Sequence, residues 1–541
     1  MRADYPSHMM RVEPNSYELN LQLKAIVLDD KFNVIHEATV HFDNDLPEFR
    51  THGGVIHDKN NLGVVTAPTL MWVKALDMLM DRLTVCGVDY SKIVAISGAA
   101  QQHGSVYWHN GAEKSLQNLD SSLFLHQQLA SSFSINQSPT WMDSSTSLQC
   151  KLLEDVVGGP KELAEITGSR GYERFTGAQI KKIADTKQDA YKSTGRISLI
   201  SSFLCSLFLE KIAPIDYVEA SGTNLFDIKT KTWNQRLLEA CGSDLELKLG
   251  QPVPSNTKLG TISRYYAERW NFNPNCQIVA FTGDNSASLV GIRLNQGWVA
   301  ISLGTSDTVF LWLNEPRVVL DGHIFCNPVN KDAYIGLLCF KNGSLARERI
   351  RNNCSEGSWE IFNQLLDSTP RGNFGNIGLY YNVQEILPFL CGDYRFNKAG
   401  DRILKFTSLE VEVRALIEGQ FIAKRAYAED FGFVFDKDTK ILATGGASCN
   451  KAILQVMADV FNAPVYVLDI TNSAAVGSAY QAKIGLHEPE NAFKEIMSSL
   501  PAPELACTPY PDAAEIYEPM VRRYRTIAAN LTKEKKSLRK L

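Results

Sequence analysis

Short apolar runs alternate with longer amphipathic segments along most of this 541-residue chain. Segment 67–83 shows the pattern of one helix face, because its apolar side chains recur three or four residues apart, at Leu76, Leu79, Met80 and Leu83. Strands that alternate with helices are typical of α/β proteins, in which a helix connects neighbouring strands. The pattern therefore predicts an α/β fold.

Two segments in different halves of the chain predict a strand, a tight turn and a second strand. The first has apolar runs at 93–96 and 106–108, and the second has them at 299–303 and 309–313. Residues 440–469 predict a βαβ unit with a Gly-Gly turn after its first strand. A duplicated ATPase-like fold would show such an echo between its halves, so the echo favours an internal duplication.

Two more segments predict helices. Residues 199–209 are the most apolar stretch, but they are too short to span a bilayer and contain serines, so we expect a buried core helix. Residues 407–430 predict a long helix, with Thr407 and Glu410 spaced as a capping box at its start.

Composition and charge narrow the possible functions. The chain is 44% hydrophobic and 21% charged, which is ordinary for a globular protein, and it is too long for one core. Two large domains are therefore the default expectation. The formal net charge of −5 indicates no excess of basic groups, so we do not expect nucleic acid as a partner.

The cysteines and the first residues of the chain predict a reducing compartment. The eleven cysteines are scattered singly, and no Cys pair or Cys/His cluster has the spacing of a zinc site. Residues 1–20 lack the apolar core of a signal peptide. We expect a cytoplasmic protein without a membrane partner.

The stretch 280–291 places one carboxylate between an apolar strand and a helix start. Asp284 and Asn285 follow the apolar run, and small residues follow them. An Asp at such a position commonly caps a helix by accepting a backbone N–H. It also suits phosphoryl transfer to an alcohol, which needs a carboxylate to orient the hydroxyl and accept its proton. The turns described next favour the second interpretation.

Two glycine turns suit phosphate groups. Gly304 and Thr305 begin a Gly-Thr-Ser-Asp turn, where backbone N–H groups and hydroxyls can cradle phosphate oxygens. Gly445 and Gly446 lie between a strand and a helix start, another position that attracts phosphate. A plain hairpin and a tight strand-to-helix connection fit the same two patterns, and Asp307 would then only stabilise the first turn.

Polar side chains at three turns suit a polyhydroxylated ligand. Gln102 and His103 stand between two apolar strands and offer donors and acceptors for hydroxyl groups. Trp141 can stack on the apolar face of a sugar, and Asp143 can accept hydrogen bonds from its hydroxyls. Arg174 follows an aromatic region at the third turn. A lone histidine is more often a satisfied turn residue, but the group as a whole predicts a sugar site.

These motifs, in this order, resemble the FGGY family of carbohydrate kinases, and within it the eukaryotic enzymes that act on D-xylulose. They are LPEFRTHGGV, SGAAQQHGSVYW, WMDSST, TGSRGYERFTG, FTGDNSASL, SLGTSDT, CFKNGS, RALIEGQF and LATGGAS. The resemblance runs from about residue 24 to past residue 480. It implies two actin-like (ribonuclease H-like) ATPase domains with an interdomain cleft, the sugar binding to residues 1–294 and ATP to residues 295–541. It also implies that ATP, with Mg²⁺, phosphorylates D-xylulose to D-xylulose 5-phosphate.

The resemblance assigns roles to single residues. It implies that a first set contacts the sugar: His103, Arg174, Asp284 and Asn285. Within that set it implies that Asp284 is the catalytic base on the 5-hydroxyl. It implies that a second set contacts ATP: Gly304, Thr305, Trp359, Gly446 and Asn450. The sequence leaves the metal ligands and the oligomeric state open.

The first residues depart from the family pattern. The family has a phosphate turn of the form G-x-D-x-S-T-Q-x-x-K after its first strand, and its Asp helps to hold the metal and phosphates. Here the Asp position falls on Tyr17 and the Ser-Thr position on Leu19 and Asn20, and the first strand is replaced. Loss of that carboxylate would lower the rate by orders of magnitude. Three explanations of the missing turn are open: a wrongly joined first exon, an isoform with an altered start, or a catalytically impaired sugar-binding homologue. Separately, the polar cluster does not choose between epimers, so a kinase for another ketose such as ribulose is the alternative within the enzyme class.

Overall fold

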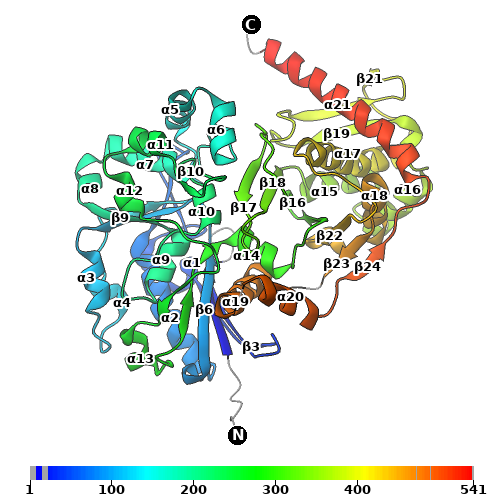
Figure 1. The fold of residues 1–541 in the computed structure, drawn as a ribbon. Helices are drawn as coiled ribbons and strands as arrows, with labels where there is room; N and C mark the ends of the chain where they lie inside the picture. Colours follow the sequence, from blue (N-terminus) through cyan, green and yellow to red (C-terminus); the bar gives the residue numbers. More distant parts are fainter. Residues whose placement is uncertain (1–7, 15–21, 469, 471, 488, 539–541) are drawn as a thin grey trace. The chain divides into compact units, whose positions relative to one another are not determined.

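The computed structural model describes residues 8–14, 22–468, 470, 472–487 and 489–538, which form two compact units (Figure 1). Unit 1 contains the described residues within Met1–Arg293, Phe325–Ala333 and Ile470–Pro501. Unit 2 contains those within Leu294–Ile324, Tyr334–Asp469 and Ala502–Leu541. A late segment of the chain, 470–501, therefore belongs to the first unit, which a single boundary after residue 294 does not anticipate.

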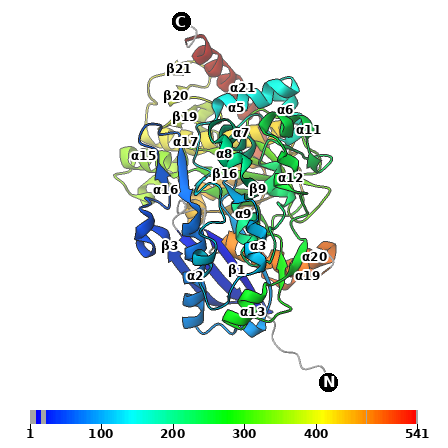
Figure 2. The ribbon, with the colours of Figure 1, turned by 90° about the vertical axis from the view of Figure 1, so that its left-hand side faces the viewer.

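Unit 1 is built on a mixed sheet with the strand order β12-β13-β6-β1-β2-β3. The strands are β1 (His8–Pro14), β2 (Gln22–Leu28), β3 (Val34–His41), β6 (Ile93–Ala100), β12 (Lys258–Thr261) and β13 (Gln277–Val279). β1, β2 and β3 are antiparallel neighbours, whereas β6 is parallel to both β1 and β13. Helix α2 (Thr69–Val85) packs against β2 and β3 (Figure 2).

Unit 2 repeats this arrangement with other strands. They are β15 (Trp298–Leu303), β16 (Asp307–Leu313), β18 (Tyr334–Phe340), β22 (Lys440–Thr444), β23 (Val465–Val467) and, beyond β23, β24 (Glu504–Cys507). β15, β16 and β18 are antiparallel neighbours, and β22 is parallel to both β15 and β23. Each unit thus joins three antiparallel neighbours to two parallel strands, so the predicted α/β class is confirmed and the two sheets share one arrangement.

The two copies do not correspond in the way that the sequence pattern suggested. The segment near residue 304 is an antiparallel pair, β15 and β16. In the segment near residue 98, β6 is followed by β7 (Ser105–His109), which pairs with β9 (Thr194–Leu199) in a separate sheet. By strand order β6 corresponds to β22, not to β15. The predicted echo was therefore wrong in its pairing, because apolar runs around a polar turn look alike whether or not the strands pair.

The helices predicted from apolar spacing form. α2 buries the whole predicted face, Leu76, Leu79, Met80 and Leu83. α9 (Ile200–Ser206) is buried at every residue, as expected for a core helix. α17 (Leu409–Asp430) also forms, but its N-cap residue is Ser408, so the predicted capping box of Thr407 and Glu410 is wrong.

The remaining helices of eight residues or more are divided between the units. Those of unit 1 are α5 (Ser147–Val157), α6 (Pro160–Thr167), α7 (Thr176–Thr186), α14 (Asp284–Gly291), α19 (Ser473–Leu486) and α20 (Pro489–Ser499). Those of unit 2 are α15 (Ser344–Cys354), α16 (Trp359–Ser368), α18 (Lys451–Phe461) and α21 (Ala513–Leu538).

A close approach of two helices holds α14 in unit 1. α14 packs against α19, which comes from the late segment of the chain (Figure 1). A Cβ on Gly291 would lie 1.9 Å from the backbone oxygen of Ser473, and a Cβ on Gly477 would lie 1.7 Å from that of Ala287. Only glycine permits such contact, so these two glycines let α19 fix the helix that begins with Asp284.

The strand β1 fills the centre of the unit 1 sheet, between β2 and β6, where the sequence predicts a replaced strand. The positions of the missing phosphate turn, Tyr17, Leu19 and Asn20, lie outside the described residues. All eleven cysteines lie in the described part of the chain and none is in a disulfide. Within that part, no helix combines the length and apolar character needed to cross a membrane.

Candidate active site

Asp284 is the first residue of α14, at the edge of the unit 1 sheet. The short strand β14 (Thr282–Gly283) runs parallel to the end of β6, with Thr282 opposite Ala99 and Gly283 opposite Ala100. The residue that follows β14 therefore lies beside the turn that follows β6. Asp284 is buried, and its Oδ1 accepts hydrogen bonds from Asn285 N at 2.7 Å and Asn285 Nδ2 at 3.1 Å. The N-cap position belongs to Gly283, so Asp284 does not cap the helix.

The turn after β6 brings Gln102 and His103 to this place. Gln102 Oε1 accepts a hydrogen bond from Asn285 Nδ2 at 3.0 Å, which joins the turn directly to α14. His103 has a left-handed backbone, with φ of 71°, and its Nδ1 lies 3.1 Å from the backbone oxygen of Gly222. Its ring lies 4.6 Å from the ring of Phe175, measured between centroids. Both side chains are therefore held in defined orientations.

Trp141 and Arg174 form a second part of the same region. The Arg174 guanidinium carbon lies 5.1 Å from the centre of the Trp141 ring, a cation–π contact. The backbone N–H of Trp141 donates to Gln101 Oε1 at 3.3 Å, and Arg174 stands one residue before Phe175, which packs on His103. The structure thus brings together the predicted sugar residues Gln102, His103, Trp141, Arg174, Asp284 and Asn285 through direct contacts or sequence neighbours.

Asp143 has a different surrounding from the one predicted. It is fully buried, and five donors reach its carboxylate: Val65 N, Ser145 N, Ser145 Oγ, Gln179 Nε2 and Lys182 Nζ. Burial alone would raise the pKa of Asp143, but these hydrogen bonds and the Lys182 charge hold it below its usual range. A carboxylate has about four lone-pair positions, so little capacity is left for a ligand. Asp143 therefore stabilises its own turn, and the prediction that it receives sugar hydroxyls is not supported.

Sequence reasoning missed two buried acids next to Asp284. Asp216 is the N-cap of α10 (Tyr217–Ser221), and Glu219 lies within that helix. Burial raises the pKa of Asp216 to about 6, although hydrogen bonds from Ser255 and Thr282 lower it. Burial raises the pKa of Glu219 well above its usual range, and the charges of Asp216 and Asp284 add to this. The only signal in the sequence is one Glu within an otherwise small or apolar run, Val218–Ser221.

The two glycine turns of unit 2 lie side by side. Because β15 is parallel to β22, with Ser302 opposite Thr444, both strands end at the same edge of the sheet. Gly304–Ser306 follows β15, and Gly445 follows β22. A Cβ on Gly445 would lie 2.7 Å from the backbone oxygen of Leu303, at a φ of 82°, so the second turn requires glycine. A Cβ on Gly446 would meet no atom within 4 Å.

A buried ion cluster supports the first turn from behind. Asp307 Oδ2 lies 2.8 Å from Arg347 Nη1 and 2.9 Å from Lys424 Nζ. Burial alone would raise the pKa of Asp307, but the charges of Lys424 and Arg347 outweigh it and hold the pKa below its usual range. Arg347 Nη2 also donates to Gly304 O at 3.3 Å, so the cluster is linked to the turn itself. The predicted role of Asp307 in stabilising the turn is consistent with these contacts.

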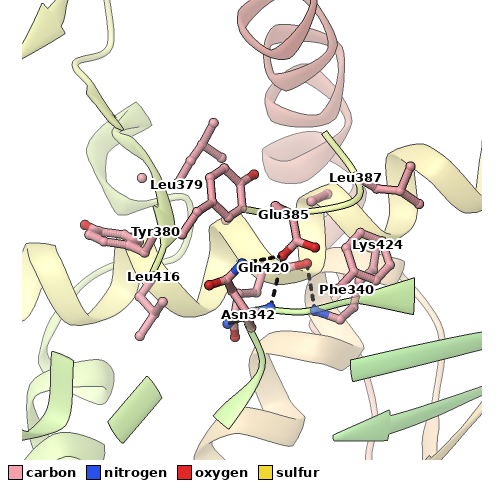
Figure 3. Close-up of a pocket in the computed structure, with 13 residues that line it drawn as sticks. Phe340, Asn342, Leu379, Tyr380, Glu385, Leu387, Leu416, Gln420 and Lys424 are labelled. Carbon is pink, nitrogen blue, oxygen red and sulfur yellow. Dashed lines mark hydrogen bonds between the residues drawn. The ribbon is translucent and has the colours of Figure 1, made fainter. Parts of the chain in front are cut away.

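A small pocket lies beside this cluster, lined in part by Asn342, Glu385, Gln420 and Lys424 (Figure 3). Its polar groups are bonded to one another. Glu385 accepts from Asn342 N at 3.0 Å and Nδ2 at 2.9 Å, and Gln420 Nε2 donates to Asn342 O at 2.8 Å. The pocket therefore supports the 342–344 loop, which bonds to the turn through Ser344 N and Gly304 O at 2.8 Å.

Trp359 and Asn450 belong to neighbouring helices of unit 2. Asn450 is the N-cap of α18, since its Oδ1 accepts from Ile453 N at 3.2 Å. Its Nδ2 donates to Asn363 Oδ1 at 2.9 Å, and Asn363 lies one turn after Trp359 on α16. The Arg351 guanidinium carbon lies 4.7 Å from the centre of the Trp359 ring. The residues predicted to contact ATP therefore all lie in unit 2, around the glycine turns and the starts of α16 and α18.

The chain is similar to carbohydrate kinases along almost its whole length. Residues 134–291 match the N-terminal domain of the FGGY family of carbohydrate kinases, and residues 299–486 match its C-terminal domain. The chain is 54% identical to the xylulose kinase of Rattus norvegicus over 504 residues, 93% of this chain and 94% of the relative. It is 46% identical to xylulose kinase 2 of Arabidopsis thaliana over 475 residues, 86% of this chain and 85% of the relative.

Solved structures share the fold. The xylulose kinase of Rhodospirillum rubrum has a TM-score of 0.78 at 16% identity, covering 97% of this chain and 99% of that one. The gluconate kinase of Lactobacillus acidophilus has a TM-score of 0.76 at 18% identity, covering 98% of this chain and 99% of that one. The N-terminal and C-terminal domains of the family match this chain in the family's own order. The rat and Arabidopsis relatives are 54% and 46% identical to it over most of its length. This chain belongs to the FGGY family of carbohydrate kinases.

Proposed function

We propose that this chain transfers the γ-phosphoryl group of ATP to D-xylulose and forms D-xylulose 5-phosphate. The observation that carries the proposal is the 54% identity to the rat xylulose kinase over 93% of this chain. The chemistry of the two units agrees with it. Unit 1 gathers amide, imidazole and guanidinium groups that suit a polyhydroxylated ligand, and unit 2 has two glycine turns that suit phosphates.

Asp284 is the proposed general base. Its carboxylate accepts the proton of the 5-hydroxyl while the sugar oxygen forms a bond to the γ-phosphorus and the bond from that phosphorus to ADP breaks. Its position in the first turn of α14 places the carboxylate at the N-terminal end of a helix, which carries partial positive charge. The two bonds from Asn285 to Oδ1 restrict how the carboxylate can rotate.

The proposed sugar contacts are Gln102, His103, Trp141, Arg174 and Asn285, all in unit 1. The imidazole of His103 is held through Nδ1 near the Gly222 oxygen, which suits Nε2 to a ligand hydroxyl. The Trp141 ring suits the apolar face of a sugar, and the guanidinium beside it suits hydroxyl oxygens. A site that hydrogen-bonds several hydroxyls discriminates against sugars that lack one of them.

The proposed ATP contacts are Gly304, Thr305, Trp359, Gly445, Gly446 and Asn450, all in unit 2. The two adjacent turns present backbone N–H groups, which suit phosphate oxygens, and Trp359 suits the flat face of the base. Mg²⁺ carried with ATP would neutralise charge on the phosphates. No group of three His, Cys, Asp or Glu side chains in the described ranges suits a metal ion, so we propose that phosphate and water oxygens supply most of its ligands.

A coupled assay of ADP release tests the proposal. The purified chain is incubated with ATP, Mg²⁺ and D-xylulose, and parallel reactions contain D-ribulose or no sugar. We expect ADP release that depends on D-xylulose and exceeds the rate with D-ribulose. Binding of D-xylulose without turnover, in a chain with a cooperative melt, would instead favour an impaired homologue, as the residues at Tyr17, Leu19 and Asn20 suggest. Preferred turnover of D-ribulose would move the proposal to another ketose.

The proposal also covers the compartment in which the enzyme works and the partners that it binds. None of the eleven cysteines is in a disulfide, which suits a reducing compartment. We therefore infer that the enzyme works in the cytoplasm on its sugar and ATP without a nucleic-acid or membrane partner.

A further inference from the structure

A buried acid, Glu219, stands directly behind the proposed sugar site. It is 2% exposed and lies in α10, an element to which sequence reasoning assigned no function. Its Oε2 accepts a hydrogen bond from Ser201 Oγ at 2.8 Å. Its Oε1 lies beside the Gln102 side chain, because a Cβ on Gly283 would be 2.5 Å from Glu219 Oε1 and 2.9 Å from Gln102 Nε2. Glu219 is therefore fixed on one side by the core helix α9 and contacts a proposed sugar residue on the other.

A chain of contacts connects Glu219 to the proposed base. Gln102 Oε1 accepts from Asn285 Nδ2 at 3.0 Å, so the Gln102 amide nitrogen is the donor that remains on the side of Glu219. Asn285 Nδ2 in turn lies 3.1 Å from Asp284 Oδ1. Glu219 thereby determines which way the Gln102 amide faces, and Gln102 determines where the Asn285 amide lies.

The backbone before Asp284 is shaped to admit this contact. A Cβ on Gly283 would lie 2.5 Å from Glu219 Oε1, 2.6 Å from Gln102 Cγ and 2.9 Å from Gln102 Nε2. The φ of Gly283 is −73°, which any residue can adopt, so its backbone conformation does not require glycine. Position 283 requires glycine because the Glu219 and Gln102 side chains leave no room for a Cβ.

The enclosure of Glu219 suits a holding role and not a second base. Glu219 is 2% exposed and lies beside two other carboxyl groups, Asp216 and Asp284. Burial and these two neighbours raise its pKa well above the usual range. A carboxyl oxygen in this position can accept from Gln102, but it does not reach a proton on the sugar.

We propose that Glu219 is a positioning residue for phosphoryl transfer, acting through Gln102 and Asn285 on the orientation of the Asp284 carboxylate. The proposal rests on the proposed function of Asp284 as the base. It requires the length of the Glu219 side chain and a carbonyl acceptor at its end, but not an ionisable group. A purely structural role would instead depend on filling the buried space, and its loss would lower stability without a specific effect on the chemical step.

Two conservative variants separate these requirements. Glu219→Gln keeps the length and the acceptor, whereas Glu219→Asp keeps the acid but is one methylene too short to reach Gln102. Asp77→Asn is a matched control, because Asp77 is a second buried acid of unit 1 that accepts hydrogen bonds, from Leu125 N and His126 N at 3.0 Å, away from the site. Each variant is assayed with ATP, Mg²⁺ and D-xylulose below its melting temperature, with kcat and both KM values measured.

We expect Glu219→Asp to lower kcat about 10- to 100-fold, the range produced by a misplacement of about 1 Å, with KM for ATP unchanged. Glu219→Gln should keep kcat within about threefold of the wild type, and Asp77→Asn should lower the melting temperature without lowering kcat. Wild-type kcat in Glu219→Asp, or an equal loss in Glu219→Gln, would overturn the positioning role while leaving the proposed function intact. A wild-type chain that does not turn over D-xylulose would overturn both.

Discussion

Replacing Asp307 by Asn removes the one negative charge that two buried cations share. The side chains of Asp307, Arg347 and Lys424 are each at most 1% exposed, and both cations lie within 2.9 Å of the carboxylate. The variant keeps the shape of the side chain but leaves two positive charges in the interior of unit 2. Removing one partner of a buried pair costs about 3–5 kcal/mol, because the remaining charge has lost its compensation. We expect a loss of that size in the free energy of unfolding of unit 2.

A second acid on a strand of unit 2 provides the matched control. Asp393 pairs with Arg349 at 2.7 Å, but the two side chains are 24% and 32% exposed. A partly exposed pair contributes less than a fully buried one, because water already screens it. Asp393→Asn should therefore lower the same free energy by less than Asp307→Asn does.

Native-state hydrogen exchange measures this stability within one unit. Amides of β15, β16 and α17 report on unit 2, and amides of β6 report on unit 1 as an internal reference. A loss of 3–5 kcal/mol corresponds to exchange about 10²- to 10⁴-fold faster in the most protected unit 2 amides. Exchange in Asp307→Asn within about fivefold of the wild type would refute the reasoning that the three charges are energetically coupled. So would an equal acceleration in Asp393→Asn.

Three further predictions follow from the same contacts. The pKa of Asp307 is lower in the folded than in the unfolded protein, so its contribution to stability is present above the unfolded value of 3.8 and is lost as pH falls through the folded pKa. Hydrogen exchange of unit 2 amides, measured at decreasing pH, should show this loss in the wild type and not in Asp307→Asn. Gly446→Leu should raise KM for ATP at least about tenfold without changing the melting temperature, and an unchanged KM would exclude Gly446 from the ATP site. Gly445→Ala should instead lower the melting temperature, because its Cβ would lie 2.7 Å from Leu303 O. Gly291→Ala should lower the melting temperature by several degrees, because its Cβ would lie 1.9 Å from Ser473 O; a wild-type melt would show that α14 and α19 are not packed as described.

The pattern of apolar residues predicted which helices and strands form better than it predicted which strands pair. α2 and α9 form because each has enough apolar side chains on one face, or on all faces, to fix its burial. The partner of β7 is β9, which is distant in sequence, and periodicity carries no information about which strands pair. The capping box failed for a local reason, since the chain starts α17 one residue later than the Thr407–Glu410 spacing requires.

The candidate site was predictable where residues with unusual chemistry stand at turns. Gln102, His103, Asp284 and Asn285 were visible because polar side chains interrupt apolar strands at those points. Glu219 and Asp216 were not, because a buried acid in a short helix looks like any solvent-exposed acid in the sequence. Asp143 shows another limit of this reasoning, since the sequence does not reveal that the carboxylate of a polar turn residue is hydrogen-bonded to its own neighbours.

The assignment of 470–501 to unit 1 was also beyond sequence reasoning. Helix α19 follows the βαβ unit of unit 2 without a break in composition, and yet it packs on α14 through Gly291 and Gly477. Close packing of glycine against backbone is a three-dimensional requirement, and single glycines within a helical pattern do not identify their partner.

The central claim is that Asp284 removes the proton of the sugar hydroxyl as phosphate is transferred. The most direct measurement compares the wild type with Asp284→Asn, using ADP release for turnover and intrinsic tryptophan fluorescence for D-xylulose binding. Loss of a general base lowers the rate about 10²- to 10⁴-fold, whereas the Asn side chain can still bond a hydroxyl. We predict a fall in kcat of that size with D-xylulose affinity within about tenfold of the wild type. Turnover by Asp284→Asn at the wild-type rate would contradict the account.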